Sequence, residues 1–475
     1  MRRSPWATLA VLALAQFIVV LDVTIVNVAL PDIQSDLNFS ADTLQWVISA
    51  YTLLFGGFLL LGGRMADLLG PRRVFIAGLL LFGVTSLIAG LSESAGFLIG
   101  ARAVQGLGGA LLSPAALAIL TVTFAHGRER NIAMGVWGGL AGLGGTLGVV
   151  AGGVLVDTLS WQWVFFVNVP IVIALVAVIP VFVPDTRHGA DGPRTFDTAG
   201  AVLGTAGLMA VVYAVVRAEP KGWGSAEVIG FLGGGLVLLA LFVRVEARSK
   251  APLVPLRLFR SRALSVSSTS LALNGAGFLS MFFLTAIYLQ QVRGDSALEA
   301  GVHFLPMGAA AVIGAVVASQ LVQRLGTRTV QLSGTVLSVV GLLLLSRADA
   351  TGSYASQLLL GLILFGVGII GVAVPAQIAA VSDVEHHEAG SASGVVTAMY
   401  QVGGALGLAI VTTLSISKTT DALEHGVAQQ QALVEGFQRG LLIAALFAIA
   451  NVAVTLATPQ IQPAREQIAE AAAAA

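Results

Sequence analysis

Long apolar runs, separated by short clusters of glycine, proline and charged residues, follow one another along the whole sequence. Most runs contain about 20 residues, the length of helix needed to cross roughly 30 Å of hydrocarbon. The runs lie near residues 7–31, 43–62, 74–92, 97–122, 131–156, 163–183, 198–216, 226–244, 263–291, 301–323, 328–346, 355–381, 390–415 and 436–457. This pattern predicts an all-α membrane protein with fourteen transmembrane helices.

Composition agrees with a membrane protein and excludes several other classes. Of the 475 residues, 56% are hydrophobic and 11% are charged, whereas soluble domains carry about 25% charged residues. The formal net charge is zero, so nothing suggests a nucleic-acid partner. The chain has no cysteine, which excludes disulfides, zinc thiolates and iron–sulfur ligation. We therefore expect no metal and no cofactor.

Basic residues concentrate in every second loop between the runs. With a cytoplasmic N-terminus, the inner loops contain Arg64, Arg72, Arg73, Arg128, Arg130, Arg187, Arg194, Arg244, Arg248, Lys250, Arg257, Arg260, Arg262, Arg324 and Arg328. Cytoplasmic loops carry an excess of Lys and Arg, so both termini are expected in the cytoplasm. The acidic inner loop 383–388 departs from this trend. Richness in Ala, Gly, Val and Leu is typical of a GC-rich bacterial source, which points to the bacterial inner membrane.

Three groups of residues recur at nearly constant spacing. Gly70-Pro71-Arg72-Arg73-Val74 recurs 256 positions later (326 − 70) as Gly326-Thr327-Arg328-Thr329-Val330. Gly106 and Gly108 recur as Gly366 and Gly368, and Gly144 and Gly148 recur as Gly403 and Gly407. Chance matches between glycines are the alternative explanation. We interpret the repeats as two six-helix pseudo-repeat bundles, 1–183 and 263–457, with a two-helix insertion and basic cytoplasmic loop at 184–262 and a cytoplasmic tail at 458–475.

A carboxylate interrupts the first apolar run. Asp22 lies nine positions before Pro31, about 13 Å along a helix, and an Asp near the centre of a membrane helix costs about 2.5–3.5 kcal/mol. A cap at the membrane surface is the simpler alternative, but the depth argues against it. We expect Asp22 to face a cavity or a partner and to serve function.

Arg102 is the matching charge in the fourth run. It lies about five residues, or roughly 8 Å, inside the run, so the two charges can share one pocket. A nearby guanidinium favours an ionised carboxylate and burial disfavours it, which is the balance that proton coupling requires. A fixed structural ion pair is the alternative. Asn27 and Gln105 are placed to hydrogen-bond the charges or a substrate.

The first inner loop has a regular spacing of glycine and charge. Gly63, Asp67, Gly70, Arg72 and Arg73 predict a tight reversal with an acidic group near a helix N-terminus. We expect a conformational latch on the cytoplasmic side. The general excess of Lys and Arg in cytoplasmic loops would explain the arginines, but it would explain neither the glycines nor Asp67.

Gly144, Gly148, Gly152 and Gly153 form a ridge of small residues on the fifth run. Such ridges let membrane helices approach closely. General packing explains each glycine, and the matching register in the second half also favours a gating interface.

Neutral polar residues within the runs are candidates for the lining of a substrate cavity. They are Asn27, Gln45, Trp46, Tyr51, Gln105, Asn274, Gln290, Gln377, Tyr400 and Gln401. Hydrogen bonds between helices are the alternative for each of them. The tryptophans of segment 161–170 are expected at the membrane interface. No phosphate-binding loop, catalytic triad or metal-ligand spacing is present, so we expect a protein that is not an enzyme.

Taken together, these motifs resemble the major facilitator superfamily, and within it the fourteen-helix drug:proton antiporters of the EmrB and QacA type. The resemblance rests on Leu21-Asp22-x-Thr24-Ile25-Val26-Asn27-Val28-Ala29-Leu30-Pro31, on Gly63, Asp67, Gly70 and Arg72, on Arg102, Gln105 and Gly106, and on the W-x-W…N-x-P pattern at 161–170. It implies export of lipophilic or amphiphilic small molecules in exchange for protons, with Asp22 and Arg102 in the coupling apparatus.

Two departures from the family pattern bear on coupling. Leu68 and Pro71 replace usual basic residues of the inner loop, and Val149 replaces a proline expected in the fifth helix. A proton-coupled importer or a flippase for lipid-like substrates is the main alternative function, and a receptor or channel is a third. Two complete halves need no partner, so we expect a functional monomer in the lipid bilayer.

Overall fold

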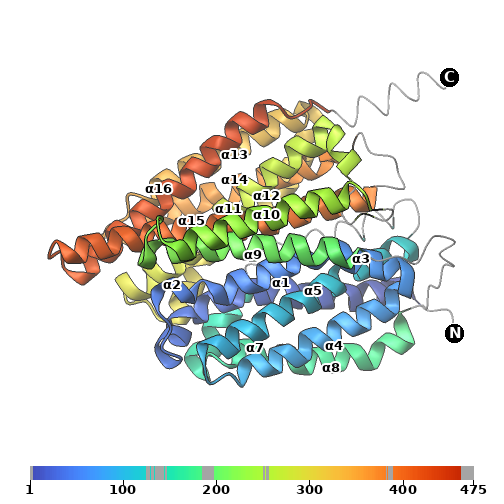
Figure 1. Ribbon diagram of the computed structural model, residues 1–475, viewed down its shortest axis with the longest axis horizontal. Helices are drawn as coiled ribbons and strands as arrows, with labels where there is room; N and C mark the ends of the chain where they lie inside the picture. Colours follow the sequence, from blue (N-terminus) through green and yellow to red (C-terminus); the bar gives the residue numbers. More distant parts are fainter. Residues whose placement is uncertain are drawn as a thin grey trace. The chain divides into compact units, whose positions relative to one another are not determined.

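The computed structural model describes residues 4–124, 147–183, 197–249, 256–380 and 389–461, together with Glu129, Ala133, Gly144, Pro252 and Ser382. The elements in this part of the chain are helices (Figure 1). They are α1 (Pro5–Asp36), α2 (Ala41–Leu44), α3 (Trp46–Leu69), α4 (Pro71–Gly90), α5 (Ala95–Thr123), α7 (Trp163–Phe166), α8 (Asn168–Phe182), α9 (Thr198–Lys221), α10 (Ala226–Glu246), η1 (Leu256–Arg260), α11 (Arg262–Ile287), η2 (Tyr288–Val292), α12 (Ala297–Leu325), α13 (Thr327–Leu345), η3 (Ala355–Leu359), α14 (Leu360–Ala380), α15 (Ala389–Glu424) and α16 (Gln429–Leu456). This arrangement confirms the predicted all-α membrane fold.

Within the described residues, eleven helices are long and apolar enough to cross a membrane. Three shorter apolar helices, Trp46–Leu59, Leu147–Thr158 and Val202–Ala218, lie between them in the chain. Part of the predicted run 131–156 falls outside the described residues, so the total of fourteen spans stays a prediction.

The chain divides into two compact units. Unit 1 comprises 1–254 and 289–302, and unit 2 comprises 255–288 and 303–475. The chain therefore crosses between the units at 288/289 and again at 302/303. The first crossing lies in the π-helical turn η2 (Tyr288–Val292), and the second lies four residues before Pro306 inside α12.

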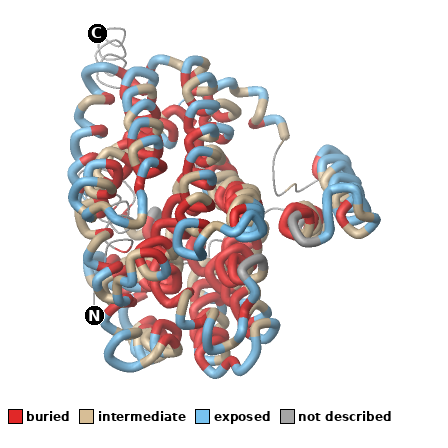
Figure 2. The backbone as a smooth tube through the Cα atoms, turned by 90° about the vertical axis from the view of Figure 1, so that its left-hand side faces the viewer, coloured by how far each residue is buried: buried red, intermediate tan, exposed pale blue. Residues whose placement is uncertain are grey.

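In unit 1, α5 packs against α3 and α4, and α1 and α8 pack beside them. Because lipid tails are as apolar as the side chains, membrane helices associate by close packing more than by hydrophobic burial. Gly108 illustrates this, since a Cβ placed on it would lie 2.7 Å from the backbone nitrogen of Phe82. Figure 2 shows buried positions along the packed helix faces and exposed positions on the others.

The helices of the predicted insertion form a hairpin, α9 and α10, which belongs to unit 1. Their side-by-side arrangement is visible in Figure 1. The α9 helix packs against α3, where the Trp46 and Tyr213 rings are 6.5 Å apart. Most of the apolar stretch of α10 is exposed, with 11% of it buried, as expected of a helix that faces lipid.

Unit 2 repeats the close approaches of unit 1. A Cβ on Gly368 would lie 2.5 Å from the backbone nitrogen of Ser338, which corresponds to the approach of Gly108 to Phe82. Gly70 and Gly326 precede α4 and α13 with φ angles of 94° and 82°. Glycine adopts such angles readily, and the chain can therefore reverse in one residue at both places.

The structure corrects the predicted extent of the first inner loop. Gly63 was expected in a turn, but it lies inside α3, which continues to Leu69. A Cβ on Gly63 would lie 3.7 Å from the Pro114 side chain, so the helix continues in close contact with α5. Only Gly70 separates α3 from α4.

Candidate functional site

Asp22 lies in the interior of α1, and its side chain is fully buried. The helix continues for fourteen residues beyond it (36 − 22), which excludes a capping role. A carboxylate in this position needs partners, because an unpaired buried charge is costly.

Arg102 of α5 provides the opposite charge. Its Nη1 lies 2.5 Å from Asp22 Oδ2, and the Arg102 side chain is 1% exposed. The same Nη1 donates to Gln105 Oε1 at 2.7 Å, and Nε donates to the Val47 carbonyl oxygen at 3.0 Å. The guanidinium therefore connects α5 to α1 and to the start of α3.

Two side-chain amides share the other oxygen of the carboxylate. Gln105 Nε2 donates to Asp22 Oδ1 at 2.9 Å, and Asn168 Nδ2 donates to the same atom at 3.3 Å. Both amides also donate to Ser86 Oγ, at 3.2 and 3.0 Å respectively. Ser86 Oγ in turn donates to the Phe165 carbonyl oxygen at 2.9 Å. We call Asp22, Ser86, Arg102, Gln105 and Asn168 the Asp22 network.

Aromatic rings cover the guanidinium. The Arg102 Cζ atom lies 4.3 Å from the centroid of the Tyr51 ring and 5.7 Å from that of Phe165. A desolvated cation over an aromatic face gains about 2 kcal/mol or more. These rings therefore help to hold a positive charge in apolar surroundings without adding another formal charge.

The network holds a buried ion pair with hydrogen-bond partners on both carboxylate oxygens. Removing one member of such a pair destabilises a protein by about 3–5 kcal/mol, because the other charge is left uncompensated. Intramembrane charges that face the protein interior mark proton or substrate pathways. Chemically, the Asp22 carboxylate can stay ionised beside Arg102, or it can take up a proton and become neutral.

Sequence reasoning missed Asn168 and Ser86. Asn168 was noted only as part of the W-x-W…N-x-P pattern, yet it opens α8, is fully buried and donates to Asp22. Trp161 is 4% exposed and its Nε1 donates to Asp36 Oδ2 at 2.7 Å, and its expected position at the membrane interface stays a prediction. The available signal was the polar Asn168 at the head of an otherwise apolar run, which is the same signal that identified Asp22.

The remaining cavity candidates of unit 1 are Asn27, Gln45, Trp46 and Gln290. Asn27 Nδ2 donates to the Val23 carbonyl oxygen at 2.8 Å, so this amide bonds its own helix. Gln45 is buried at the start of α3, and Trp46 faces α9. Gln290 belongs to unit 1, and its Nε2 donates to the Val28 carbonyl oxygen at 3.1 Å.

The cavity candidates of unit 2 are all neutral. Asn274 is buried, and its Nδ2 donates to the Ile369 carbonyl oxygen at 3.1 Å. Tyr400 and Gln401 are half-buried, and Gln377 is exposed. Among the described residues, the buried charged side chains are Asp22, Arg102, Asp197 and Glu246, all in unit 1. The cavity role of the unit 2 residues stays a prediction.

The predicted latch is described in part. Gly70 joins α3 to α4, Arg72 is half-buried and Arg73 is exposed in the first turn of α4. The side chain of Asp67 lies outside the described residues. Its electrostatic role therefore stays a prediction.

The glycine ridge packs against α1. Cβ atoms on Gly144 and Gly152 would lie 2.8 Å from Val20 Cγ1 and 2.9 Å from the Ile25 carbonyl oxygen. A Cβ on Gly148 would lie 3.0 Å from the Leu21 carbonyl oxygen, next to Asp22. Gly153 instead meets Leu298 at the start of α12, with 2.5 Å between the placed Cβ and the Leu298 Cα.

Comparisons with known proteins agree with this arrangement. The profile of the Major Facilitator Superfamily matches residues 12–408. The chain is 40% identical to the puromycin resistance protein pur8 of Streptomyces alboniger, over 95% of this chain and 90% of that protein. It is 39% identical to the cephamycin export protein CmcT of Amycolatopsis lactamdurans, over 86% of this chain and 84% of that protein.

Solved structures resemble the chain in fold. The nucleoside transporter NupG matches with a TM-score of 0.66 at 13% identity, covering 96% of this chain and 100% of that chain. An inward-facing bacterial homologue of the human lysosomal transporter Spinster matches with a TM-score of 0.65 at 17% identity, covering 95% of this chain and 96% of that chain. The profile match and these relatives place the chain in the major facilitator superfamily.

Proposed function

We propose that the protein exports lipophilic or amphiphilic small molecules, including antibiotics, across the bacterial inner membrane in exchange for protons. The observation that carries the proposal is the buried Asp22–Arg102 pair, whose carboxylate accepts from three side-chain donors. The relatives support the direction of transport, since one is named for puromycin resistance and another for cephamycin export.

Protonation of Asp22 changes the strength of the connection between α1 and α5. With the carboxylate ionised, Arg102 is held by a charge-assisted bond, which is roughly twice as strong as a neutral one. With the carboxyl neutral, Arg102 keeps Gln105 and the Val47 carbonyl but loses its counter-ion. Proton uptake therefore weakens the connection, and proton release restores it.

This change of strength gives a route to coupling. A proton shifts a conformational equilibrium only when it interacts differently with the two states. In the described state the donors Arg102, Gln105 and Asn168 stabilise the ionised carboxylate, whereas burial favours the protonated form. A second state that separates Asp22 from Arg102 would favour the protonated form, and transport would alternate between the two.

The charges of the Asp22 network also bear on the chemical class of the substrate. The intramembrane charges of the site neutralise each other, so a strongly charged substrate would have few partners there. We therefore propose neutral or amphiphilic compounds, and puromycin is the first candidate because of the named relative. Both termini in the cytoplasm and a functional monomer complete the proposal.

The test is proton movement in sealed vesicles that contain the purified protein. Puromycin added on one side is expected to drive protons in the opposite direction, and a protonophore should abolish the resulting pH difference. Protein-free vesicles are the control. Transport of puromycin and protons in the same direction would indicate an importer, and saturable puromycin transport without proton movement would refute coupling.

A further inference from the structure

One face of α4 carries small residues where the helix packs against α7 and α8. Gly83 and Gly90 lie on this face, three residues before and four residues after Ser86. A Cβ placed on Gly83 would lie 2.6 Å from Val172 Cγ1, and a Cβ placed on Gly90 would clash with the Phe166 ring. Positions three and four apart share one face of a helix, so Ser86 lies in the middle of this close contact.

The Ser86 hydroxyl uses all of its hydrogen-bonding capacity at this contact. A serine hydroxyl has one hydrogen to donate and two lone pairs that accept. The hydrogen goes to the Phe165 carbonyl oxygen at 2.9 Å. The lone pairs therefore accept from Gln105 Nε2 at 3.2 Å and from Asn168 Nδ2 at 3.0 Å. Because its single hydrogen is donated to Phe165, Ser86 can bind only the N–H side of either amide.

Each of these amide nitrogens also donates to Asp22. An amide NH₂ group has two hydrogens. On both Gln105 and Asn168, one hydrogen goes to Ser86 Oγ and the other goes to Asp22 Oδ1. An amide turned end over end would place its oxygen against the carboxylate oxygen and against the Ser86 lone pair. Ser86 therefore selects, in both amides, the orientation that donates to Asp22.

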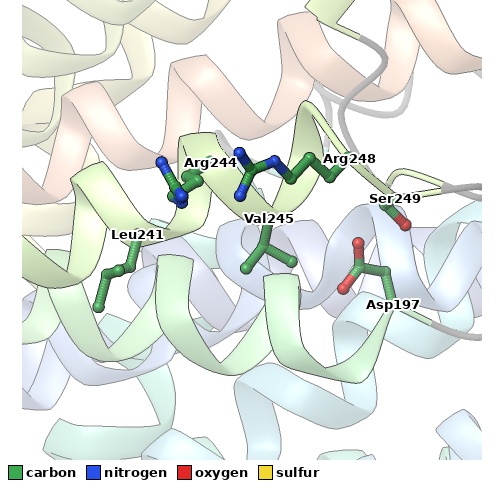
Figure 3. Close-up of a pocket in the computed structure, with 6 residues that line it drawn as sticks. All are labelled: Asp197, Leu241, Arg244, Val245, Arg248 and Ser249. Carbon is green, nitrogen blue, oxygen red and sulfur yellow. The ribbon is translucent and has the colours of Figure 1, made fainter.

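This selection is needed because a side-chain amide can turn, whereas a backbone donor in a helix cannot. Asp197 shows the second arrangement. It lines the cleft of Figure 3 at the start of α9, and its Oδ1 accepts from the backbone nitrogen of Gly200 at 2.6 Å. The helix fixes the direction of that N–H group. Both donors to Asp22 Oδ1 are side-chain amides, so another residue must hold their direction.

Asn168 depends on Ser86 more than Gln105 does. Gln105 Oε1 accepts from Arg102 Nη1 at 2.7 Å, so the oxygen end of this amide is held independently. Asn168 Oδ1 is buried and has no hydrogen-bond partner among the described residues. The hydrogen bonds of the Asn168 nitrogen therefore orient this amide by themselves, and the bond to Asp22 is the longer of the two at 3.3 Å. Loss of the Ser86 hydroxyl would leave Asn168 with that longer bond alone.

We propose that Ser86 is a positioning residue for proton coupling, which acts on Asp22 by holding the Asn168 amide as a donor to Oδ1. The proposal rests on the coupling role of Asp22 proposed above. Within the described residues, the charged or titratable side chains beside Asp22 are Arg102 of α5 and Tyr51 of α3, whose ring lies 4.3 Å from the guanidinium. A change of Ser86 replaces neither of them, so its effect on proton binding comes from the hydrogen bonds.

The test follows proton binding to Asp22 by infrared difference spectroscopy of the purified full-length protein at a series of pH values. A carboxyl C=O stretching band that is present in the unchanged protein and absent from Asp22→Asn reports protonated Asp22. Hydrogen bonds donated to a carboxylate favour its ionised form, and Ser86→Ala weakens one of them. The midpoint of the band's pH titration should therefore rise by roughly one pH unit in Ser86→Ala.

Ser92→Ala is the matched control for this substitution. Ser92 is also buried, and its hydroxyl donates to the Ile88 carbonyl oxygen at 3.2 Å, outside the Asp22 network. The control should leave the titration midpoint unchanged. An unchanged midpoint in Ser86→Ala as well, with a lower unfolding temperature, would make Ser86 a packing residue and overturn the proposal.

A double variant tests whether Ser86 acts through Asn168. Asn168→Ala alone should raise the midpoint, and adding Ser86→Ala to it should cause little further change, because the amide that Ser86 positions is already absent. Additive shifts would mean that Ser86 acts on Asp22 independently of Asn168, which would refute the proposed role. The unfolding temperature of each variant verifies that the protein is still folded.

Failure of the proposed function gives a different result. A titrating Asp22 band without proton movement in vesicles would refute proton-coupled export, while the effect of Ser86 on the titration could still be measured. If no Asp22 band appeared at any pH at which the protein stays folded, the coupling role of Asp22 and the role of Ser86 would both be refuted.

Discussion

The Nη1 atom of Arg102 lies 2.5 Å from Oδ2 of Asp22, with both side chains buried between helices of unit 1. The pair does not stand alone, because Gln105 and Asn168 occupy the second carboxylate oxygen. Both carboxylate oxygens therefore have side-chain donors, and changes to the members of the Asp22 network should affect transport in different ways.

Replacing Asp22 with Asn should abolish proton-driven efflux and leave substrate binding intact. The amide cannot exchange a proton, and although the shape of the side chain is almost unchanged, the Arg102 charge loses its counter-ion, so the unfolding temperature should also fall. Proton movement and puromycin binding are measured on the same vesicle preparation. Glu93→Gln, which removes an exposed carboxylate of unit 1, is the control. Normal gradient-driven transport by Asp22→Asn would exclude Asp22 from coupling.

Arg102→Lys should also impair transport, although it keeps the positive charge. A lysine cannot donate to Asp22, Gln105 and the Val47 carbonyl from a planar fork. Each buried acceptor left without a donor costs about 1–3 kcal/mol, so the unfolding temperature should fall as well. Efflux equal to that of the unchanged protein would mean that charge alone suffices at this position.

Asn168→Ala should uncouple transport more than it destabilises the protein. The change removes donors to Asp22 Oδ1 and Ser86 Oγ, at a cost of about 1–3 kcal/mol. Asn451→Ala, at a buried position of unit 2, is the matched control and should lower stability without changing the ratio of protons to substrate. If both variants transported protons and substrate in the same ratio, Asn168 would contribute to packing and not to coupling.

Gly148→Ala should disturb the contact between the Leu147–Thr158 helix and α1. The new methyl group would clash with the Thr24 hydroxyl and lie 3.0 Å from the Leu21 carbonyl oxygen, and such overpacking costs about 1–3 kcal/mol. Gly233→Ala in α10 has no neighbour within 4 Å of the new atom and should be neutral or slightly stabilising. Thermal unfolding of the two variants distinguishes a packed glycine from an exposed one, and equal unfolding temperatures would contradict the described packing.

Gly70→Ala should destabilise the junction of α3 and α4 without any steric clash. Gly70 has φ 94° and nothing within 4 Å of a placed Cβ, so the expected cost of about 1–3 kcal/mol comes from backbone strain. Gly100→Ala in α5 has the same open surroundings without the unusual φ angle. A similar unfolding temperature for both variants would mean that the junction tolerates other backbone angles.

The sequence was informative where one physical constraint dominates. The long apolar runs had to become helices, because no other backbone structure of that length satisfies its hydrogen bonds in lipid. Asp22 and Arg102 stood out because charge is rare at that depth, and the structure places them in contact. Their coupling role is still a prediction, as is the assignment of bundle boundaries at 183 and 263.

The sequence was less informative where the outcome depends on contacts between distant segments. Asn168 joins Asp22 across 146 positions, and no local pattern reveals which polar residue at the end of an apolar run will turn inward. Gly63 carried the composition of a turn, but α3 continues through it to Leu69 and packs against α5. Likewise, nothing in the order of residues indicated that 289–302 would associate with unit 1.

That short segment has a mechanical consequence for the transporter. At its first residues the chain forms the π-helical turn η2, with i→i+5 hydrogen bonds. Just beyond its last residue, Pro306 lacks the backbone N–H that would otherwise bond the carbonyl oxygen of Val302. Both places where the chain passes from one unit to the other therefore coincide with gaps in the regular α-helical ladder. The backbone has fewer regular α-helical hydrogen bonds there than an unbroken helix has, so bending costs least at the two points that flank these fourteen residues (302 − 289 + 1).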